Sequence, residues 1–382
     1  MDLLVLSEMR WGYFRTRKQF LLSRFPAPWR VFFAQPPVAG GDDPWNPRQE
    51  GRVTYFTVPF LKPGTTSPLY NGVVALGPGR ALIEAVAGHH LRRMLRRLGV
   101  EERPVVLVSN IYCARTLSRL PRKLLFYDFN DSPFQFAGAP PWARAYWRRT
   151  LDQVDAFFVV SEYYRRELSA QTDKPILLLG NGVEFERFAA AREVPPELAV
   201  LPRPRIGYLG LLSHFLDFEL LETLRRARRG GTLVLLGPGD PATGAQVRAL
   251  AAREGVAVLG PKRYEDVPAF LQGLDLGVIP FRASEPHVQG INPNKVYQYL
   301  AAGLPVVTTP VLDLEPVPPV LQFAASVPEW ERAVARALEA AHDPEASRAL
   351  ARPHDWDRLS EHMVAEIERR VGSPAAGRVP VS

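Results

Sequence analysis

Residues 290–310 carry polar side chains in a spacing suited to binding an anion. Asn292, Lys295 and Gln298 recur every three residues, so on a helix they would share one side. Free amides and the positive end of the helix dipole at residues 291–294 would favour a phosphate, and Lys295 would add a full charge. We therefore predict a site for a phosphate-bearing ligand at the start of this helix.

Both ends of this helix carry sequence signals. Asn292 can serve as its N-cap and Pro293 as its first helical residue. Gly303 supplies a left-handed stop, and Pro305 prevents the helix from continuing. The signals predict a helix over residues 293–302.

The elements around this segment follow a regular alternation. Short aliphatic runs alternate with helix-like segments along the chain, which is typical of parallel sheets covered by helices. In the first half, we predict strands over residues 3–6, 31–34, 53–58, 105–108, 124–127, 156–160 and 176–179, with helices near 16–24, 80–98, 141–152 and 162–170. In the second half, we predict strands over 205–208, 232–236, 256–259, 275–279 and 305–309, with helices over 217–228, 243–254, 265–272 and 328–341. The pattern predicts an α/β fold with two Rossmann-like, doubly wound parallel sheets.

The length of the chain indicates more than one core. A chain of 382 residues exceeds what a single core usually supports. The proline-rich stretch 189–204 interrupts the alternation and is typical of a linker. We expect domains over residues 1–195 and 196–350, a helix over 351–371 that crosses back to the first domain, and a mobile tail over 372–382.

The composition is that of a soluble globular protein. It is 46% hydrophobic and 23% charged, and no apolar run approaches the roughly 18 residues that cross a bilayer. Residues 1–10 lack the features of a signal peptide, which favours the cytoplasm. The single cysteine, Cys113, excludes an internal disulfide and is interpreted as a buried residue.

Arginine supplies most of the net charge of +7, since only six of the 47 basic residues are lysine. Clusters in the first half comprise Arg15, Arg17, Lys18 and Arg24; Arg92, Arg93, Arg96 and Arg97; and Arg144, Arg148 and Arg149. Such clusters can bind nucleic acid, anionic lipid headgroups or a phosphorylated substrate, or they can be solvated helix faces. The absence of a zinc-finger, RNA-recognition or helix-turn-helix signature argues against nucleic acid. The arginine clusters are therefore either solvated helix faces or sites of peripheral contact with the anionic inner face of a membrane or with a phosphorylated substrate.

Four loops in the second half carry glycine at the carboxyl ends of predicted strands. They are residues 207–210, 237–240, 260–263 and 290–295. One such loop is usually only a turn from strand to helix. Four in series favour a ligand site, because ligands bind at the carboxyl ends of parallel strands.

Polar residues also follow strands of the first half. Asp131, Ser109 and Asn110 lie where predicted strands end, so they are candidate ligands for a second substrate. Asp131 is either a general base or a carboxylate that caps the next helix. We place two acid pairs, Asp128 with Asp131 and Asp313 with Glu315, away from the phosphate loop, so no metal site is predicted.

Several of these segments carry a family resemblance. Residues 206–210 read Ile-Gly-Tyr-Leu-Gly, residues 275–280 read Asp-Leu-Gly-Val-Ile-Pro, and residues 295–307 read Lys-Val-Tyr-Gln-Tyr-Leu-Ala-Ala-Gly-Leu-Pro-Val-Val. With these motifs, residues 200–312 resemble the donor domain of GT-B glycosyltransferases of the retaining family 4 group. Gly-Asn-Gly-Val-Glu at residues 180–184 is similar to the element that closes the first domain in that group.

The resemblance implies a nucleotide diphosphate sugar held mainly by the second domain, with a sugar or lipid-linked acceptor on the first domain across a cleft. The implied donor-binding residues are Gly210, Ser213, His214, Gly237, Gly239, Pro261, Lys262, Arg263, Gly290, Ile291, Asn292, Lys295 and Gln298. His287 also borders these loops. The family usually has a glutamate pair separated by seven residues, where this chain has Gly290 and Gln298. Glutamine still accepts a hydrogen bond from a ribose hydroxyl, but without charge.

The resemblance also implies a reaction. Lys295, Asp131 and Asn110 are the candidate catalytic residues of a retaining, metal-independent transfer to a hydroxyl acceptor. No cofactor is expected apart from the nucleotide sugar as co-substrate, and the role would be in synthesis of an envelope, capsule or exopolysaccharide. Because the glutamate pair is absent, a catalytically silent sugar or nucleotide binding protein is the alternative, followed by a sugar-nucleotide epimerase.

Overall fold

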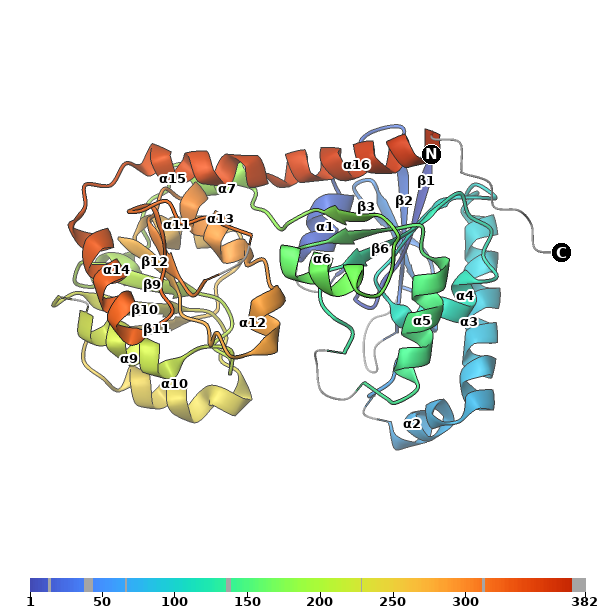
Figure 1. Cartoon of the computed structure of the whole chain (residues 1–382), viewed down its shortest axis with the longest axis horizontal. Helices are drawn as coiled ribbons and strands as arrows, with labels where there is room; N and C mark the ends of the chain where they lie inside the picture. Colours follow the sequence, from blue (N-terminus) through green and yellow to red (C-terminus); the bar gives the residue numbers. More distant parts are fainter. Residues whose placement is uncertain are drawn as a thin grey trace. The chain divides into compact units, whose positions relative to one another are not determined.

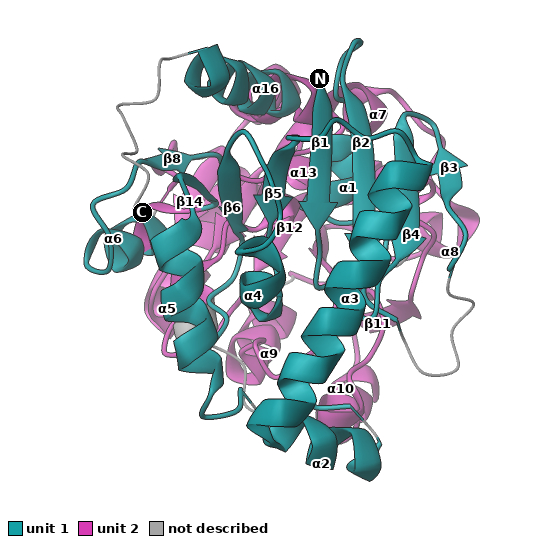
Figure 2. Cartoon of the chain, turned by 90° about the vertical axis from the view of Figure 1, so that its right-hand side faces the viewer, with its two compact units in different colours: residues 1–160, 164–179, 359–382 teal, residues 161–163, 180–358 magenta. Residues whose placement is uncertain are grey.

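The computed structural model describes residues 1–12, 15–37, 44–65, 67–134, 139–227, 229–310 and 313–372. The chain divides into two compact units. Unit 1 comprises residues 1–160, 164–179 and 359–382, and unit 2 comprises residues 161–163 and 180–358 (Figures 1 and 2). The boundary expected at residue 195 therefore lies inside unit 2. The expected tail falls outside the described residues, apart from Gly372 at the end of the last helix.

Unit 1 is built on an eight-stranded sheet in the order β3-β4-β2-β1-β5-β6-β7-β8. All neighbouring strands are parallel except the antiparallel edge pair of β3 and β4. The strands are β1 (Asp2–Leu6), β2 (Arg30–Gln35), β3 (Arg48–Glu50), β4 (Val53–Thr57), β5 (Val105–Val108), β6 (Leu125–Phe129), β7 (Ala156–Val159) and β8 (Ile176–Leu178). β1, β5 and β6 are buried along their whole length, as expected for central strands covered on both faces.

The helices of unit 1 include one long surface helix. They are α1 (Arg17–Leu22), α2 (Pro68–Ala75), α3 (Gly77–Arg97), α4 (Ala114–Leu117), α5 (Ala143–Gln153) and α6 (Glu162–Ser169), of which the first two residues are in unit 2. The last helix, α16 (Trp356–Gly372), belongs to unit 1 from Leu359 onward. There its Ser360 hydroxyl donates to Leu21 O at 2.9 Å.

Unit 2 has a fully parallel six-stranded sheet in the order β11-β10-β9-β12-β13-β14. Its strands are β9 (Arg205–Leu209), β10 (Thr232–Leu236), β11 (Val256–Gly260), β12 (Leu276–Ile279), β13 (Val306–Thr308) and β14 (Leu321–Phe323). Its helices are α7 (Phe185–Ala189), α8 (Pro196–Ala199), α9 (Phe218–Ala227), α10 (Gly244–Ala251), α11 (Val267–Gln272), α12 (Pro286–Gly290), α13 (Asn294–Ala301), α14 (Val327–Glu339) and α15 (Pro344–Ala351). The order departs from the sequence order between β9 and β12, and such a switch point is where a parallel sheet receives a ligand.

The expected α/β class with two parallel sheets is confirmed, and each predicted strand is present. β3, β14, α2, α4, α7, α8, α12 and α15 were not predicted, because short strands and short helices carry little periodicity. Cys113 is fully buried, as interpreted. Among the described residues, no helix is long and apolar enough to cross a membrane.

Candidate functional site

Three glycines mark the carboxyl edge of the sheet in unit 2. Gly210 and Gly237 follow β9 and β10, and Gly260 is the last residue of β11. Their φ angles are 138°, 149° and 68°, a region that other residues rarely adopt. The Gly210 amide donates to Leu236 O at 2.8 Å, and the Gly237 amide donates to Gly260 O at 3.0 Å. A Cβ atom on Gly237 would lie 2.0 Å from Gly210 O. The strand ends therefore approach so closely that only backbone fits between them.

Lys295 reaches this edge from the first turn of α13. A Cβ atom on Gly210 would lie 2.2 Å from the Lys295 Cε atom, so the lysine side chain runs directly over the Gly210 backbone. Its Nζ atom lies 6.0 Å from the ring centre of Tyr208 and 5.7 Å from that of Phe281. Within the part of the chain that the structure describes, no carboxylate forms an ion pair with Lys295. Burial lowers the pKa of Lys295 to about 8, because water is excluded from the charged form.

The first turn of α13 differs from the prediction. The helix starts at Asn294, and Pro293 rather than Asn292 occupies the N-cap position. The Asn292 side chain is occupied elsewhere, since its Oδ1 accepts from the Asn181 amide at 3.2 Å and its Nδ2 donates to Asp313 Oδ2 at 3.3 Å. The prediction of an Asn292 cap was wrong. No side chain caps this helix, although the Val296 amide of its first turn donates to Pro293 O at 3.1 Å.

The predicted position of Asp313, away from the phosphate loop, was also wrong. Asp313 lies against the segment that leads into α13. Its Oδ1 accepts from the Glu162 amide at 2.7 Å, and its Oδ2 accepts from Asn292. Burial raises the pKa of Asp313, and the hydrogen bonds that it accepts oppose that rise. Gly290 is fixed in the same way, since its carbonyl accepts from the Ser161 hydroxyl at 2.7 Å. Ser161 and Glu162, which belong to unit 2 although they precede most of it in sequence, thus help to hold the entry to α13.

The other predicted donor residues fall into two groups. Gly239 lies beside Leu212 in an isolated bridge, Ser213 is buried, and Gln298 is partly exposed one turn after Lys295. His214 Nδ1 lies 3.8 Å from Asp240 Oδ2.

By contrast, Lys262 and Arg263, which follow Pro261, each have an acidic partner. Lys262 Nζ lies 2.9 Å from Glu197 Oε1, and Arg263 Nε lies 2.9 Å from Asp266 Oδ2. The side chain of His287 lies outside the described residues.

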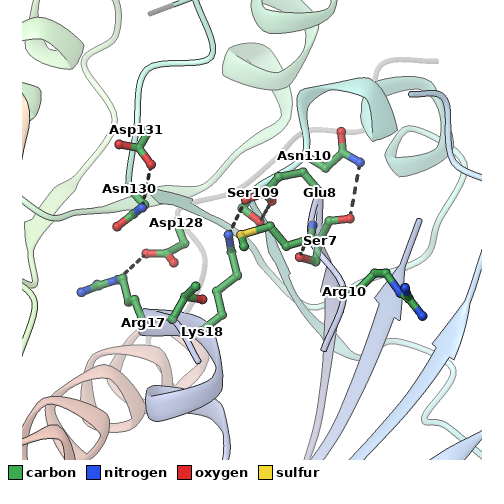
Figure 3. A network of polar contacts seen from close by, with 12 residues as sticks. Ser7, Glu8, Arg10, Arg17, Lys18, Ser109, Asn110, Asp128, Asn130 and Asp131 are labelled. Carbon is green, nitrogen blue, oxygen red and sulfur yellow. Dashed lines mark hydrogen bonds and ion pairs between the residues drawn. The ribbon is translucent and has the colours of Figure 1, made fainter. Parts of the chain in front are cut away.

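A separate pocket of about 340 Å³ lies in unit 1, where β1, β5 and β6 end. Its polar lining comprises Glu8, Lys18, Ser109, Asn110, Asp128, Asn130 and Asp131 (Figure 3). The structure therefore brings the three predicted residues Ser109, Asn110 and Asp131 into one pocket. Tyr112 and Tyr127 also line it, which gives the pocket both polar and aromatic walls.

Glu8 is the functional candidate that sequence reasoning missed. One of its carboxylate oxygens accepts from Lys18 Nζ and the other from the Ser109 hydroxyl (Figure 3). Glu8 follows β1 as Ser109 follows β5, and β1 and β5 are neighbours in the sheet. The position of Glu8 after a buried strand was the signal that could have identified it.

The basic cluster predicted around residue 17 does not form a surface patch. Arg17 and Lys18 are almost fully buried, and Arg17 Nε lies 3.1 Å from Asp128 Oδ1. Asn110 is used in a turn, since its Oδ1 accepts from the Tyr112 amide at 3.0 Å. Asp131 is partly exposed and accepts from Asn130 Nδ2 at 2.8 Å. Asp131 thus keeps some access to the pocket, whereas Asp128 is committed to Arg17.

Comparison with known proteins shows a family match over part of the second half of the chain. Residues 203–340 match the family model described as glycosyl transferases group 1. TuaH of Bacillus subtilis (strain 168), named as a glycosyltransferase of teichuronic acid biosynthesis, is 29% identical over 167 residues. That match covers 42% of this chain and 42% of TuaH, so it spans less than half of the relative's length.

Solved structures cover nearly the whole chain. HepE of Anabaena in complex with UDP has a TM-score of 0.65 at 15% identity, over 97% of this chain and 100% of that chain. A structure from E. coli of trehalose-6-phosphate bound with UDP-2-fluoro glucose has a TM-score of 0.69 at 13% identity, over 97% and 99%. At these identities the likeness shows the fold, and the expected GT-B fold is confirmed.

Proposed function

We propose that this chain, which has a GT-B fold and matches the group 1 glycosyl transferase model over residues 203–340, moves a sugar from a nucleotide diphosphate sugar to a hydroxyl acceptor. The observation that carries this proposal is Lys295, a cation without an acidic partner in the described chain, over the Gly210 backbone. Its neighbours are the uncapped first turn of α13 and the ends of β9 and β10. These groups supply positive charge and free amides at one place, which suits a diphosphate.

In the proposed donor complex, the diphosphate contacts the first turn of α13 and Lys295. Gln298 follows Lys295 by one turn on the same helix, so it faces the adjoining ribose and accepts from its hydroxyls. When the bond from the anomeric carbon to the diphosphate breaks, negative charge grows on the departing oxygen. Lys295 and the helix amides stabilise that charge in the transition state. The proposed step therefore places no metal ion at the diphosphate.

The proposed acceptor site is the pocket of unit 1. Glu8, Asn130 and Asp131 present carboxylate and amide groups, which hold sugar hydroxyls well. The aromatic walls of the pocket suit the apolar faces of a sugar ring. Asp131, as a partly exposed carboxylate, is the proposed base for the acceptor hydroxyl, with Asn110 beside it.

The finer assignments belong to the same proposal. Transfer with retention is supported by the resemblance to family 4, and a role in cell-envelope, capsule or exopolysaccharide synthesis is supported by the partial match to TuaH. A cytoplasmic location is proposed with them. A catalytically silent nucleotide binder is the second candidate, favoured by Gly290 and Gln298 in place of the usual glutamates. Slow hydrolysis of a nucleotide sugar by the purified chain would exclude the silent candidate.

The first experiment is a thermal-shift screen with UDP, GDP, ADP, CMP and TDP, because a ligand that binds the folded state raises the melting temperature. Calorimetry with the best ligand then compares Lys295→Ala with Lys123→Ala as the matched control. We expect Lys295→Ala to lose about 1.5–3 kcal/mol, or roughly tenfold to 150-fold in affinity, as for a charged hydrogen bond. Lys123→Ala removes a lysine of unit 1 that pairs with Glu101, so its affinity should match wild type. Equal affinity of Lys295→Ala and wild type would refute the placement.

A further inference from the structure

Exposed apolar side chains gather on α2 and on the first half of α3. Of the eleven large hydrophobic residues that are exposed in the described chain, five lie here: Leu69, Val73, Leu76, Leu82 and Val86. Leu69 is 81% exposed, and Leu76 and Leu82 are each about two thirds exposed at 64% and 66%. Single exposed apolar residues are ordinary, but a group of this size on one surface marks an interaction site.

The exposed side of α3 changes character along the helix. Its first half shows Pro78, Ala81, Leu82, Ala85 and Val86 to solvent, and its second half shows His89, Arg92, Arg93, Arg96 and Arg97. The buried residues Ala87, Leu91, Met94 and Leu95 cover the opposite side. A surface helix of a globular protein normally has charged residues along its whole exposed side. The exposed side of α3 is instead apolar and then basic.

Carboxylates are missing from this surface. Residues 67–97 contain five arginines and one acidic residue, Glu84, which is buried. Arg115 Nε lies 3.6 Å from Glu84 Oε2, so the Glu84 charge has a neighbouring cation. A pocket of about 100 Å³ beside Glu84 is lined by three basic groups, Arg92, Arg115 and Arg119. The exposed charge of this region is therefore entirely positive.

The two helices are held firmly as one unit. Arg80 donates from its Nη1 atom to Val74 O and Ala75 O, both at 2.8 Å, and its guanidinium stacks 4.6 Å from the ring centre of Trp142. A Cβ atom on Gly79 would lie 2.1 Å from Val73 O, so α2 and α3 are in close contact. Val74 packs in a small cluster with Leu61, Ala114 and Tyr146. Figure 2 shows α2 at the end of α3, which runs along the outside of unit 1.

We propose that α2 and α3 form a docking surface for an anionic lipid membrane. The surface is defined by the five exposed apolar residues named above together with Arg92, Arg93, Arg96 and Arg97. α3 is about 30 Å long, so both of its halves reach the interface when it lies in the membrane plane. The apolar half enters the boundary between headgroups and acyl chains, and the basic half contacts anionic headgroups. Charge complementarity decides for an anionic bilayer over a neutral one.

The test is co-sedimentation of the full chain with vesicles of phosphatidylcholine, with and without phosphatidylglycerol. We expect binding only to the anionic vesicles and loss of binding at high salt. The double variant Leu82→Glu, Val86→Glu should weaken partition by about tenfold or more. Arg92→Gln and Arg93→Gln should each weaken it by about fivefold. Val200→Glu is the matched control, since Val200 is 80% exposed in unit 2, and it should bind as wild type does.

Two results would overturn the proposal. One is wild-type partition that does not depend on phosphatidylglycerol or is unchanged in the α3 variants. The other is light scattering that shows a lipid-free dimer which Leu82→Glu converts to monomers, because the face would then bind a second copy. The melting shift with UDP reports on the donor site independently, and it also shows that each variant is folded. A failure of membrane binding is thereby distinguished from a failure of donor binding.

Discussion

The side chain of Lys295 passes over Gly210 so closely that a single methyl group on the glycine would lie 2.2 Å from Cε of the lysine. Gly210 also has φ of 138°, which an alanine rarely adopts. We therefore expect Gly210→Ala to move Lys295 and to lower the affinity for a nucleotide diphosphate by about tenfold or more, through loss of a charged hydrogen bond.

Calorimetry on Gly210→Ala and Gly12→Ala tests this relationship. A methyl group on Gly12 would have no atom of the described chain within 4 Å, and the φ of Gly12 is not positive, so Gly12→Ala is the control. Equal affinities of the two variants would show that the contact between Gly210 and Lys295 does not position the charge.

The lowered pKa of Lys295 makes donor binding depend on pH. Burial brings this pKa to about 8, and a bound diphosphate favours the ammonium form. Binding therefore takes up a proton, and affinity for UDP should fall by up to about tenfold per pH unit as pH rises above 8. Calorimetry in buffers of different ionisation enthalpy, on both sides of pH 8, measures the proton uptake. Lys295→Met should bind more weakly and lose this dependence, and an unchanged slope in that variant would assign the proton to another group.

The lowered pKa of Lys295 also makes the folding stability depend on pH. Stability should rise with pH, whereas donor affinity should fall. Between its folded pKa of about 8 and its ordinary value of 10.5, Lys295 binds more protons in the unfolded chain than in the folded one. The contribution of Lys295 to the free energy of unfolding therefore rises with pH across that window. A bound diphosphate should reduce this effect, because it restores the charged form.

A variant of Gln298 should distinguish binding of the ribose from binding of the diphosphate. Its amide is uncharged and lies one turn after Lys295, so Gln298→Ala should weaken UDP by about 0.5–1.5 kcal/mol, the usual range for a neutral hydrogen bond. Inorganic diphosphate has no ribose and should bind Gln298→Ala as it binds wild type. Gln246→Ala, at an exposed position of α10, is the control. Equal losses of affinity for UDP and for diphosphate would show that Gln298 does not bind the ribose.

The sequence predicted the strands and the placement of Lys295, because both depend on local patterns. Aliphatic runs bounded by glycine define β10 and β11, and the spacing from Lys295 to Gln298 is a property of one helix. The partners of Asn292 and Asp313 were not predictable in this way. Asn181 and Glu162 lie 111 and 151 residues away from them along the chain. Local signals favoured a cap at Asn292, and these long-range contacts overrode that preference.

A similar limit explains Glu8 and the buried basic pair of α1. In sequence, Arg17 and Lys18 have the same appearance as surface arginines, since the carboxylates that neutralise them come from other strands. The fold buries these cations only because Asp128 and Glu8 are brought beside them. Charge counts along the chain therefore overstated the basic surface near residue 17 and located the one on α3 correctly.

The ion pair between Arg17 and Asp128 gives the last prediction. Arg17 Nε lies 3.1 Å from Asp128 Oδ1, and the two side chains are 3% and 2% exposed. Asp128→Ala should lower the free energy of unfolding of unit 1 by about 3–5 kcal/mol, because a buried cation then loses its counter-charge. Urea unfolding of the double variant Arg17→Met, Asp128→Ala should show a smaller loss, since neither charge is then buried. Glu101→Ala breaks the exposed pair with Lys123 and should cost no more than about 1 kcal/mol. A double variant as unstable as Asp128→Ala would mean that packing around residue 128, rather than the charge of Arg17, sets the loss.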